Sequence, residues 1–297
     1  MQLTRRSLFT VLLAVVFACG AAAQQPASTK VIGFMTDFDV KDDAVGICRA
    51  VMDGITPGVR ILDITHQAQP FNIAMGARLL AGSAPYFPKD AVFVVVIDPT
   101  VGSTRKAIIA KSKVGQYFVL PDNGLLTLVQ DRDEIVEAHE ITNPAWMIGS
   151  GISSTFHGRD IFSPAGAHVA RGDDFREAGP ALDVTKLVRL DIKNATVDAD
   201  GLHAQVIGTD GPFGNLVLNV PAELFRQLGY KLGDKVPATL AGKSYTLPFV
   251  KTFSDVPVGA DLFYIDSRGR LGLATNQGDF SALHKTSAGA ELTIPKK

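Results

Sequence analysis

The chain has 297 residues, of which 46% are hydrophobic and 20% are charged. This balance is typical of a soluble globular protein with ample material for a core. The formal net charge of −1 gives no basic field for a nucleic-acid partner, and two cysteines exclude any cysteine cluster.

Residues 1–23 are predicted to be a signal peptide. Arg5 and Arg6 form a positive region, Leu8–Ala18 is a short apolar run, and Ala21–Ala23 offers small residues for cleavage. The apolar run is short for a membrane span. We therefore expect a periplasmic or secreted protein that has no membrane attachment after cleavage.

The export route stays open between ordinary secretion and the twin-arginine pathway, because the two arginines are adjacent. Cys19 leaves lipid anchoring as a further alternative. Cleavage after residue 23 would leave a net charge of −3 and a single cysteine, Cys48. An intrachain disulfide would then be impossible, so stability would come from packing.

Strand and helix patterns alternate over residues 30–187, which predicts an α/β domain with a mostly parallel sheet. In such sheets ligands bind beyond the carboxyl ends of the strands, where Asp37 and Asp98 stand. The expected strands are Val31–Met35, Val59–Ile64, Ala91–Ile97, Ala107–Ala110 and Tyr117–Leu120, and the expected helices are Asp42–Ile55, Ile73–Tyr86 and Asp160–Ala170.

Residues 195–297 contain short β-like runs separated by Gly and Pro, and the boundary before them lies at about residues 185–200. This pattern predicts a smaller all-β domain, a sandwich or a barrel-like sheet. The expected strands are His203–Ile207, Leu216–Val220, Val236–Leu240, Tyr245–Val250, Asp261–Ile265 and Leu271–Ala274.

Three clusters could carry chemistry. Asp37-Phe38-Asp39-Val40 fits the nucleophile motif of haloacid-dehalogenase-like phosphatases, which use an aspartate and Mg²⁺. That interpretation also needs a later lysine and an acidic metal-binding pair after a strand, and the closest acidic pair, Asp173-Asp174, follows a helix instead.

Asp98 leaves a β-branched run into a Gly/Pro turn, and Arg105 follows seven residues later. The turn can return the guanidinium to the carboxylate, as a catalytic pair or as an ordinary turn pair. His157 stands among polar residues at the entry to a helix, a better place for function than a helix face. His66 is a second histidine that could line a site.

The sequence has no Gly-x-Ser-x-Gly elbow, no Gly-Lys-Ser/Thr phosphate loop and no His-Glu-x-x-His motif. It therefore requires no metal, and we expect no cofactor.

A series of motifs occurs in a fixed order along about residues 31–280. The blocks are Thr36-Asp37-Phe38, Asp63-Ile64-Thr65-His66, Pro85-Tyr86-Phe87-Pro88, Asp98-Pro99 with Val101-Gly102 and Arg105, Pro121-Asp122-Asn123-Gly124-Leu125-Leu126, Ser154-Thr155-Phe156-His157-Gly158-Arg159-Asp160, Phe213-Gly214-Asn215 and Asp266-Ser267. In this order they resemble the S-adenosyl-L-methionine (SAM) hydroxide adenosyltransferase family, the adenosine-forming SAM hydrolases, whose relatives include the SAM-dependent fluorinase and chlorinase.

The resemblance implies an N-terminal α/β domain, a C-terminal β-barrel-like domain, and a homotrimer with sites between subunits. It implies hydrolysis of SAM to adenosine and L-methionine by water that attacks the ribose 5′ carbon. Asp98, Arg105 and His157 match the family's water-activating set, with the base open between Asp98 and His157. The halogenating relatives carry an uncharged residue at the position of Asp98, where a carboxylate would repel a halide.

The resemblance also assigns the substrate contacts. Asp37 would hold the ribose hydroxyls, Phe213 would flank the adenine, and Arg268 would be either a carboxylate partner or an exposed turn residue. The methionine end would be held by Asp210, Asn215 and Ser267.

Three positions depart from the family pattern. Asp39 stands where Gly is usual, Ala44 where Tyr is usual, and Thr100 where Gly is usual, so Thr100 would be strained if its turn needs a positive φ. The alternative functions are a SAM-dependent halogenase or other transferase, another nucleoside hydrolase, and a non-catalytic periplasmic nucleoside-binding protein.

Overall fold

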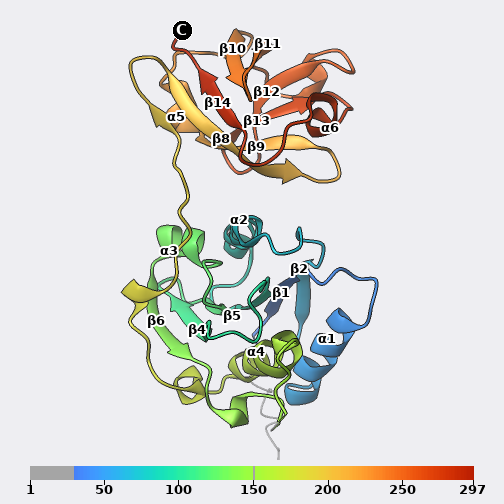
Figure 1. Cartoon of the computed structure of the whole chain (residues 1–297), viewed down its shortest axis with the longest axis vertical. Helices are drawn as coiled ribbons and strands as arrows, with labels where there is room; N and C mark the ends of the chain where they lie inside the picture. Colours follow the sequence, from blue (N-terminus) through green and yellow to red (C-terminus); the bar gives the residue numbers. More distant parts are fainter. Residues whose placement is uncertain (1–29, 150) are drawn as a thin grey trace, which may run out of the picture.

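The computed structural model describes residues 30–149 and 151–297, which form two β-sheets joined by an extended linker (Figure 1). The predicted signal peptide and Cys19 lie outside the described residues. Within the described residues, no helix combines the length and the apolar character that a membrane crossing requires.

The N-terminal sheet has the strand order β2-β1-β3-β5-β4-β6. The pairs β1–β2, β1–β3 and β3–β5 are parallel, whereas β4 is antiparallel to both β5 and β6. The sheet is therefore mixed, and the prediction of a mostly parallel sheet was too strong. The strands are β1 (Ile32–Thr36), β2 (Ile61–Thr65), β3 (Val92–Val96), β4 (Ala107–Ser112), β5 (Tyr117–Pro121) and β6 (Ile135–Glu140).

The antiparallel pairing follows from the length of one connection. Only residues 113–116 separate β4 from β5. A parallel pair needs a crossover of about a dozen residues or more, whereas a short loop can only return the chain as a hairpin. The β4–β5 hairpin therefore places one strand of reversed direction inside an otherwise parallel sheet.

Helices cover both faces of this sheet, which explains the continuous apolar runs in its strands. Val92, Val94 and Val96 of β3 point to the side of α1 and α4, and Phe93 and Val95 point to the side of α2 and α3. The helices of the chain are α1 (Ala44–Ile55), α2 (Ile73–Ser83), α3 (Thr127–Asp133), α4 (Ser163–Arg171), α5 (Ala222–Arg226) and α6 (Phe280–His284).

Cys48 of α1 is fully buried in the core between α1 and the sheet. It is a free thiol, and burial raises its pKa to about 11. Short 3₁₀ turns at Ala84–Tyr86, Pro144–Trp146, Phe175–Ala178, Val184–Lys186 and Phe253–Asp255 complete the connections.

The C-terminal sheet has the strand order β11-β10-β14-β8-β9-β13-β12, with the short β7 paired to β8. A bridge between Phe249, just after β11, and Phe263 of β12 brings its two ends together, so the sheet is a nearly closed barrel. Its strands are β7 (Thr196–Val197), β8 (Leu202–Asp210), β9 (Asn215–Pro221), β10 (Lys235–Leu240), β11 (Lys243–Pro248), β12 (Asp261–Ile265), β13 (Arg270–Thr275) and β14 (Glu291–Ile294).

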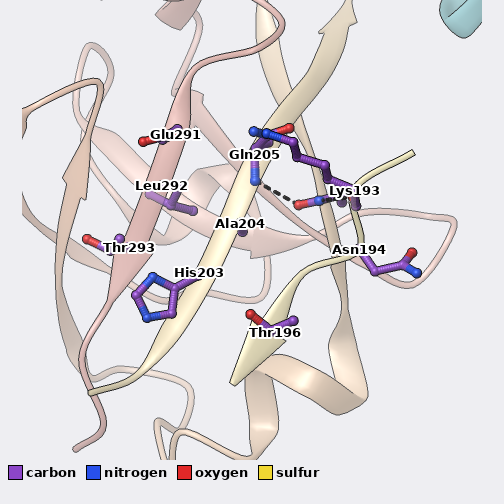
Figure 2. A pocket seen from close by; sticks show the side chains of 10 residues that line it. Lys193, Asn194, Thr196, His203, Ala204, Gln205, Glu291, Leu292 and Thr293 are labelled. Carbon is purple, nitrogen blue, oxygen red and sulfur yellow. Dashed lines mark hydrogen bonds between the residues drawn. The ribbon is translucent and has the colours of Figure 1, made fainter. Parts of the chain in front are cut away.

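The linker is tied to both sheets. On the N-terminal side, the Val188 amide donates to Asp122 (2.9 Å) and the Leu190 amide donates to Thr127 (2.9 Å). On the C-terminal side, Asn219 donates to the carbonyl of Lys193 (2.7 Å), beside the hollow over β8 and β14 that Figure 2 shows. These bonds restrict how the two parts of the chain can move.

We expect Gly166→Ala in α4 to destabilise the fold. A Cβ atom at Gly166 would lie 2.2 Å from Cγ2 of Val94, so α4 would have to move away from β3. Overpacking of this kind costs about 1–3 kcal/mol, measurable as a lower free energy of unfolding in urea. Gly46→Ala in α1 is the control, since a Cβ there meets no atom within 4 Å. Equal effects of the two substitutions would contradict the expectation.

Candidate active site

The centre of the candidate site is an ion pair at the carboxyl end of β3. Nε of Arg105 donates to Oδ2 of Asp98 at 2.8 Å, and Nη2 of Arg105 contacts the same oxygen. Both side chains are buried, with 9% and 3% of their surface exposed. Burial strengthens such a charge-assisted pair because solvent screens it little.

The turn between Asp98 and Arg105 depends on Gly102, which has a φ of 78°. A Cβ at Gly102 would lie 2.3 Å from the carbonyl oxygen of Ser154, so the loop before His157 packs directly on this turn. Thr100 does not have a positive φ, so the strain that a positive φ would cause at Thr100 does not arise. Its hydroxyl donates to Oδ1 of Asp98 at 3.3 Å.

His157 completes the cluster from the opposite loop. It stands at the start of a π-helical turn, Gly158–Phe162, which continues into α4. Nη2 of Arg105 lies 2.8 Å from Nδ1 of His157. A guanidinium can only donate, so Nδ1 must accept and the proton of the neutral ring is on Nε2. The structure thus brings Asp98, Arg105 and His157 together.

The charge of His157 is set by its surroundings. Burial lowers the pKa of His157, the adjacent Arg105 guanidinium lowers it further, and Asp98 and Asp160 oppose the shift. The imidazole is therefore neutral near pH 7, in agreement with an Nδ1 atom that accepts a hydrogen bond.

Asp160 is a structural anchor that the sequence did not single out. It is fully buried, pairs with Nε of Arg159 (2.6 Å) and accepts a hydrogen bond from the Ser153 amide (2.8 Å). Asp160 thus closes the loop 153–160 on itself and holds His157 against the turn of Asp98. The available signal in the sequence was an aspartate directly before the apolar residues Ile161 and Phe162 at the start of the expected helix, because a carboxylate in such a place needs partners.

Asp37 lies on the neighbouring loop after β1. The Phe71 amide donates to Oδ2 of Asp37 at 2.9 Å, and Oδ1 has no hydrogen-bond partner among the described residues. The next residue, Phe38, packs on the backbone of Gly158, beside His157: a Cβ at Gly158 would lie 2.9 Å from its ring. The Asp37 loop and the His157 loop therefore lie next to each other.

The backbone conformation of Asp39 explains how an aspartate can stand where the family usually has glycine. Its φ is 63°, in the left-handed region that Gly tolerates and Asp adopts more easily than most residues. Its carboxylate bonds to the Val40 amide (2.7 Å), Lys41 (3.0 Å) and Gln67 (3.2 Å). These contacts hold it in the loop, and no group of three or more potential metal-ligating side chains occurs in the described parts of the chain.

His66 is buried beneath the Asp37 loop, and its carbonyl accepts a hydrogen bond from the Asp39 amide (2.7 Å). Its Nδ1 atom lies 2.9 Å from the Thr36 hydroxyl, its Nε2 atom lies 3.1 Å from Asp63, and its ring packs edge-on against Phe34. These contacts make it a structural residue between β1 and β2.

The second group of candidate residues lies on the C-terminal barrel. Asp210 ends β8 and Asn215 begins β9, and the backbone amides of Phe213 and Gly214 donate to the carbonyl of Asp210. Phe213 is 65% exposed, and Asn215 is buried. Both line a hollow of about 620 Å³. An exposed aromatic ring at the edge of a hollow is suited to stacking on a flat base.

Ser267 and Arg268 form the tip of the β12–β13 hairpin, and both are exposed. Asp266 fixes this tip by accepting from the amides of Arg268 (2.8 Å) and Arg270 (2.9 Å). The Arg268 guanidinium extends to α2, where a Cβ at Gly82 would lie 2.6 Å from its Nη1. Arg268 thus borders a cleft between the two parts of the chain.

The two groups remain separate within one chain. Asp98, Arg105, His157 and Asp37 belong to the N-terminal part, and the remaining candidates belong to the barrel. Across residues 30–149 and 151–297, no hydrogen bond or ion pair links the first group to the second.

Comparisons with known proteins define the class. Residues 32–179 match the SAM hydroxide adenosyltransferase N-terminal domain, and residues 204–293 match the C-terminal domain of the same family. The chain therefore belongs to the SAM hydroxide adenosyltransferase family, which confirms the resemblance seen in the sequence.

Individual relatives cover nearly the whole chain. The (R)-S-adenosyl-L-methionine hydrolase of Salinispora tropica is 37% identical over 269 residues, which cover 90% of this chain and 98% of that protein. A fluorinase of Actinoplanes sp. is 30% identical over 291 residues, with coverages of 90% and 97%. The crystal structure of an uncharacterized conserved protein from Thermotoga maritima matches with a TM-score of 0.85 and 38% identity, over 89% of this chain and all of that one.

The environment of His157 gives a test by NMR. We expect its imidazole to titrate below the ordinary value of about 6.5, and to titrate at higher pH in Arg105→Met, because one repulsive charge is gone. His157→Gln identifies the resonance. The pKa of His157 is lower in the folded chain than in the unfolded chain, so between these two values the unfolded chain binds more protons. The contribution of His157 to the free energy of unfolding is therefore present above the unfolded pKa and is lost as the pH falls from the unfolded pKa to the folded pKa. A normal titration of His157 would contradict the geometry.

Proposed function

We propose that this protein hydrolyses SAM to adenosine and L-methionine. The observation that carries the proposal is the hydrogen-bonded set of Asp98, Arg105 and His157 in a chain of this family. Relatives that match 90% of the chain are named (R)-S-adenosyl-L-methionine hydrolase. A carboxylate at Asp98 favours water over halide as the nucleophile, because it repels an anion.

The chemistry matches these side chains. The water oxygen forms a bond to the ribose 5′ carbon while the bond from that carbon to sulfur breaks, and the sulfonium leaves as a neutral thioether. The leaving group needs no proton, so the protein has to align one water and accept one proton.

Asp98 is the proton acceptor in this proposal. Nδ1 of His157 already accepts from Arg105, so the neutral ring presents only the N–H of Nε2, which is a donor. Asp98 keeps acceptor capacity, and the fixed positive charge of Arg105 stabilises hydroxide as it forms. His157 then orients the water rather than deprotonating it.

Substrate binding would use both groups of residues. Asp37 would hold the ribose hydroxyls with Oδ1, which has no hydrogen-bond partner in the described part of the chain. Phe213 would flank the adenine at the edge of the barrel hollow. Asp210, Asn215, Ser267 and Arg268 would receive the methionine end.

A homotrimer with sites between subunits is part of the proposal. It is supported by the separation of the two groups of residues within one chain, since a site closed by a neighbouring copy needs no contact between them in the monomer. The exposed ring of Phe213 is also suited to cover by a second copy.

We further propose export to the periplasm or the medium. The support is the pattern of residues 1–23, with its arginine pair, apolar run and small residues.

Asp98→Asn should abolish most of the activity. Purified protein incubated with SAM without added metal should release adenosine and methionine, measured by chromatography. Loss of the proton acceptor should slow release by about 10²–10⁴-fold. Asp200→Asn, an exposed carboxylate without a side-chain partner among the described residues, is the control and should retain activity.

Two outcomes would favour an alternative function, and a third would contradict the role proposed for Asp98. Release of a 5′-halogenated adenosine in the presence of chloride would favour the halogenase. Binding of adenosine without turnover of SAM would favour a nucleoside-binding protein. Full activity of Asp98→Asn would overturn the assignment of the proton acceptor.

Shared sites predict complementation. Asp98→Ala and Phe213→Ala should each be inactive or weak alone, but co-expressed chains should form some sites that take the intact half from each variant. With random mixing in a trimer, about a quarter of the sites combine two intact halves. The measurements are adenosine release and oligomer mass by light scattering. Failure of mixed trimers to regain activity would show that each site lies within one chain.

A further inference from the structure

The buried side chains of Thr36 and His66 meet beneath the loop that carries Asp37. Thr36 ends β1, and His66 directly follows β2, the parallel neighbour of β1 in the sheet. Thr36 is fully buried, His66 is 5% exposed, and the Thr36 hydroxyl lies 2.9 Å from Nδ1 of His66. A buried polar pair therefore stands directly before the carboxylate that is proposed to hold the ribose.

A shift in strand pairing brings the two side chains together. The register of β1 with β2 changes by one residue between Phe34 and Met35. Without this change Thr65 would lie opposite Thr36, whereas with it His66 is the residue that reaches the Thr36 hydroxyl. Such bulge-like shifts redirect side chains and are common beside active sites.

The position of Asp63 determines which nitrogen of the neutral His66 ring carries the proton. Oδ1 of Asp63 lies 3.1 Å from Nε2 of His66, although the pair lacks hydrogen-bond geometry. A lone pair on Nε2 would face this carboxylate oxygen and be repelled, so the proton is on Nε2 and Nδ1 is the acceptor. The Thr36 hydroxyl therefore donates to Nδ1, and its oxygen accepts a hydrogen bond from the Phe38 amide at 3.2 Å.

The loop is also held through the backbone of residues 66–71. The Asp39 amide donates to the carbonyl of His66 at 2.7 Å, and the Phe71 amide donates to Oδ2 of Asp37 at 2.9 Å. Phe71 has a φ of 65°, which is strained for a bulky residue and persists only where surrounding contacts fix the backbone. These bonds fix one oxygen of Asp37 and leave Oδ1, which has no partner among the described residues, as the oxygen available to a ligand.

We propose that Thr36 and His66 are positioning residues for the ribose contact of Asp37. The proposal rests on the proposed function, which assigns the ribose hydroxyls to Asp37, and adds how this carboxylate is held before a ligand binds. A carboxylate that is already fixed loses less conformational entropy on binding, and its hydrogen bonds depend on direction. The two side chains act through the Phe38 amide and the loop backbone rather than by touching the ligand.

Adenosine and 2′,3′-dideoxyadenosine isolate ribose recognition, because the second nucleoside lacks both hydroxyls. Their dissociation constants are measured by isothermal titration calorimetry with the purified protein. Thr36→Val keeps the branched shape of the side chain but removes the hydroxyl. It should lower the preference for adenosine by about three- to tenfold and leave the binding of dideoxyadenosine unchanged. Thr36→Ser, which retains a hydroxyl, should retain the preference.

Two further variants test whether the pair acts through Asp37. Asp37→Ala should abolish the preference, and Thr36→Val added to Asp37→Ala should cause no further loss, because the hydroxyl has no effect without the carboxylate. His66→Leu has a bulky side chain without a ring nitrogen and should lower the preference as Thr36→Val does. It keeps the test decisive if Thr36→Val does not fold.

Thr56→Val is the matched control. The Thr56 hydroxyl is also buried in the N-terminal part, and it donates to the carbonyl of Ala167 (2.8 Å) at the end of α1 that is remote from the Asp37 loop. Its loss should leave the preference for adenosine unchanged, even where it lowers the free energy of unfolding.

The proposal is overturned if Thr36→Val and His66→Leu keep the full preference, or if they weaken both nucleosides equally, as a general loss of structure would. An unaltered protein that does not prefer adenosine to dideoxyadenosine also overturns it. Release of adenosine from SAM by the unaltered protein is measured separately. Absence of that release would contradict the proposed hydrolysis, whereas the nucleoside preferences decide the role of Thr36 and His66.

Discussion

Arg105 donates hydrogen bonds to Asp98 and to His157 at the same time. A guanidinium keeps its proton at any physiological pH and has no acceptor, so both neighbours must present lone pairs to it. One side chain thereby fixes the tautomer of the imidazole, orients the carboxylate and joins two loops that are 52 residues apart. Gly102 makes this possible, because it lets the loop before His157 approach the backbone closely, while Gly158 leaves room for the ring of Phe38 from the Asp37 loop.

The sequence was informative where function depends on local pattern. The apolar run ending at Asp98 and the polar cluster around His157 marked loops that the fold places in contact. The sequence was less informative where residues far apart in the chain determine the structure. Helix α3 and strands β6 and β14 had no strong periodic pattern; the reversed direction of β4 was also missed, although it follows from a short local connection. Arg78 is the clearest case: it resembles any cation on a helix until β8, 130 residues later, packs over it.

The barrel contributes a surface rather than a closed pocket. Its candidate residues lie on hairpin tips that other residues hold in place: Asp266 fixes Ser267 and Arg268, and the carbonyl of Asp210 fixes the turn with Phe213. Such tips are rigid without being enclosed. The linker, bonded to both sheets, limits how far this surface can move relative to α2. The hydrogen bonds of the linker therefore help to set the position of the barrel relative to the N-terminal sheet.

The burial of Cys48 has a consequence for the export that we propose. Disulfide exchange and most thiol oxidation proceed through the thiolate. With a pKa of about 11, only about one Cys48 side chain in ten thousand is ionised at pH 7, and the sulfur is fully covered by α1 and the sheet. The Cys48 thiol of the folded protein is therefore unreactive toward oxidants and other thiols. In an oxidising environment Cys48 therefore forms neither a disulfide within the chain nor a crosslink to another molecule.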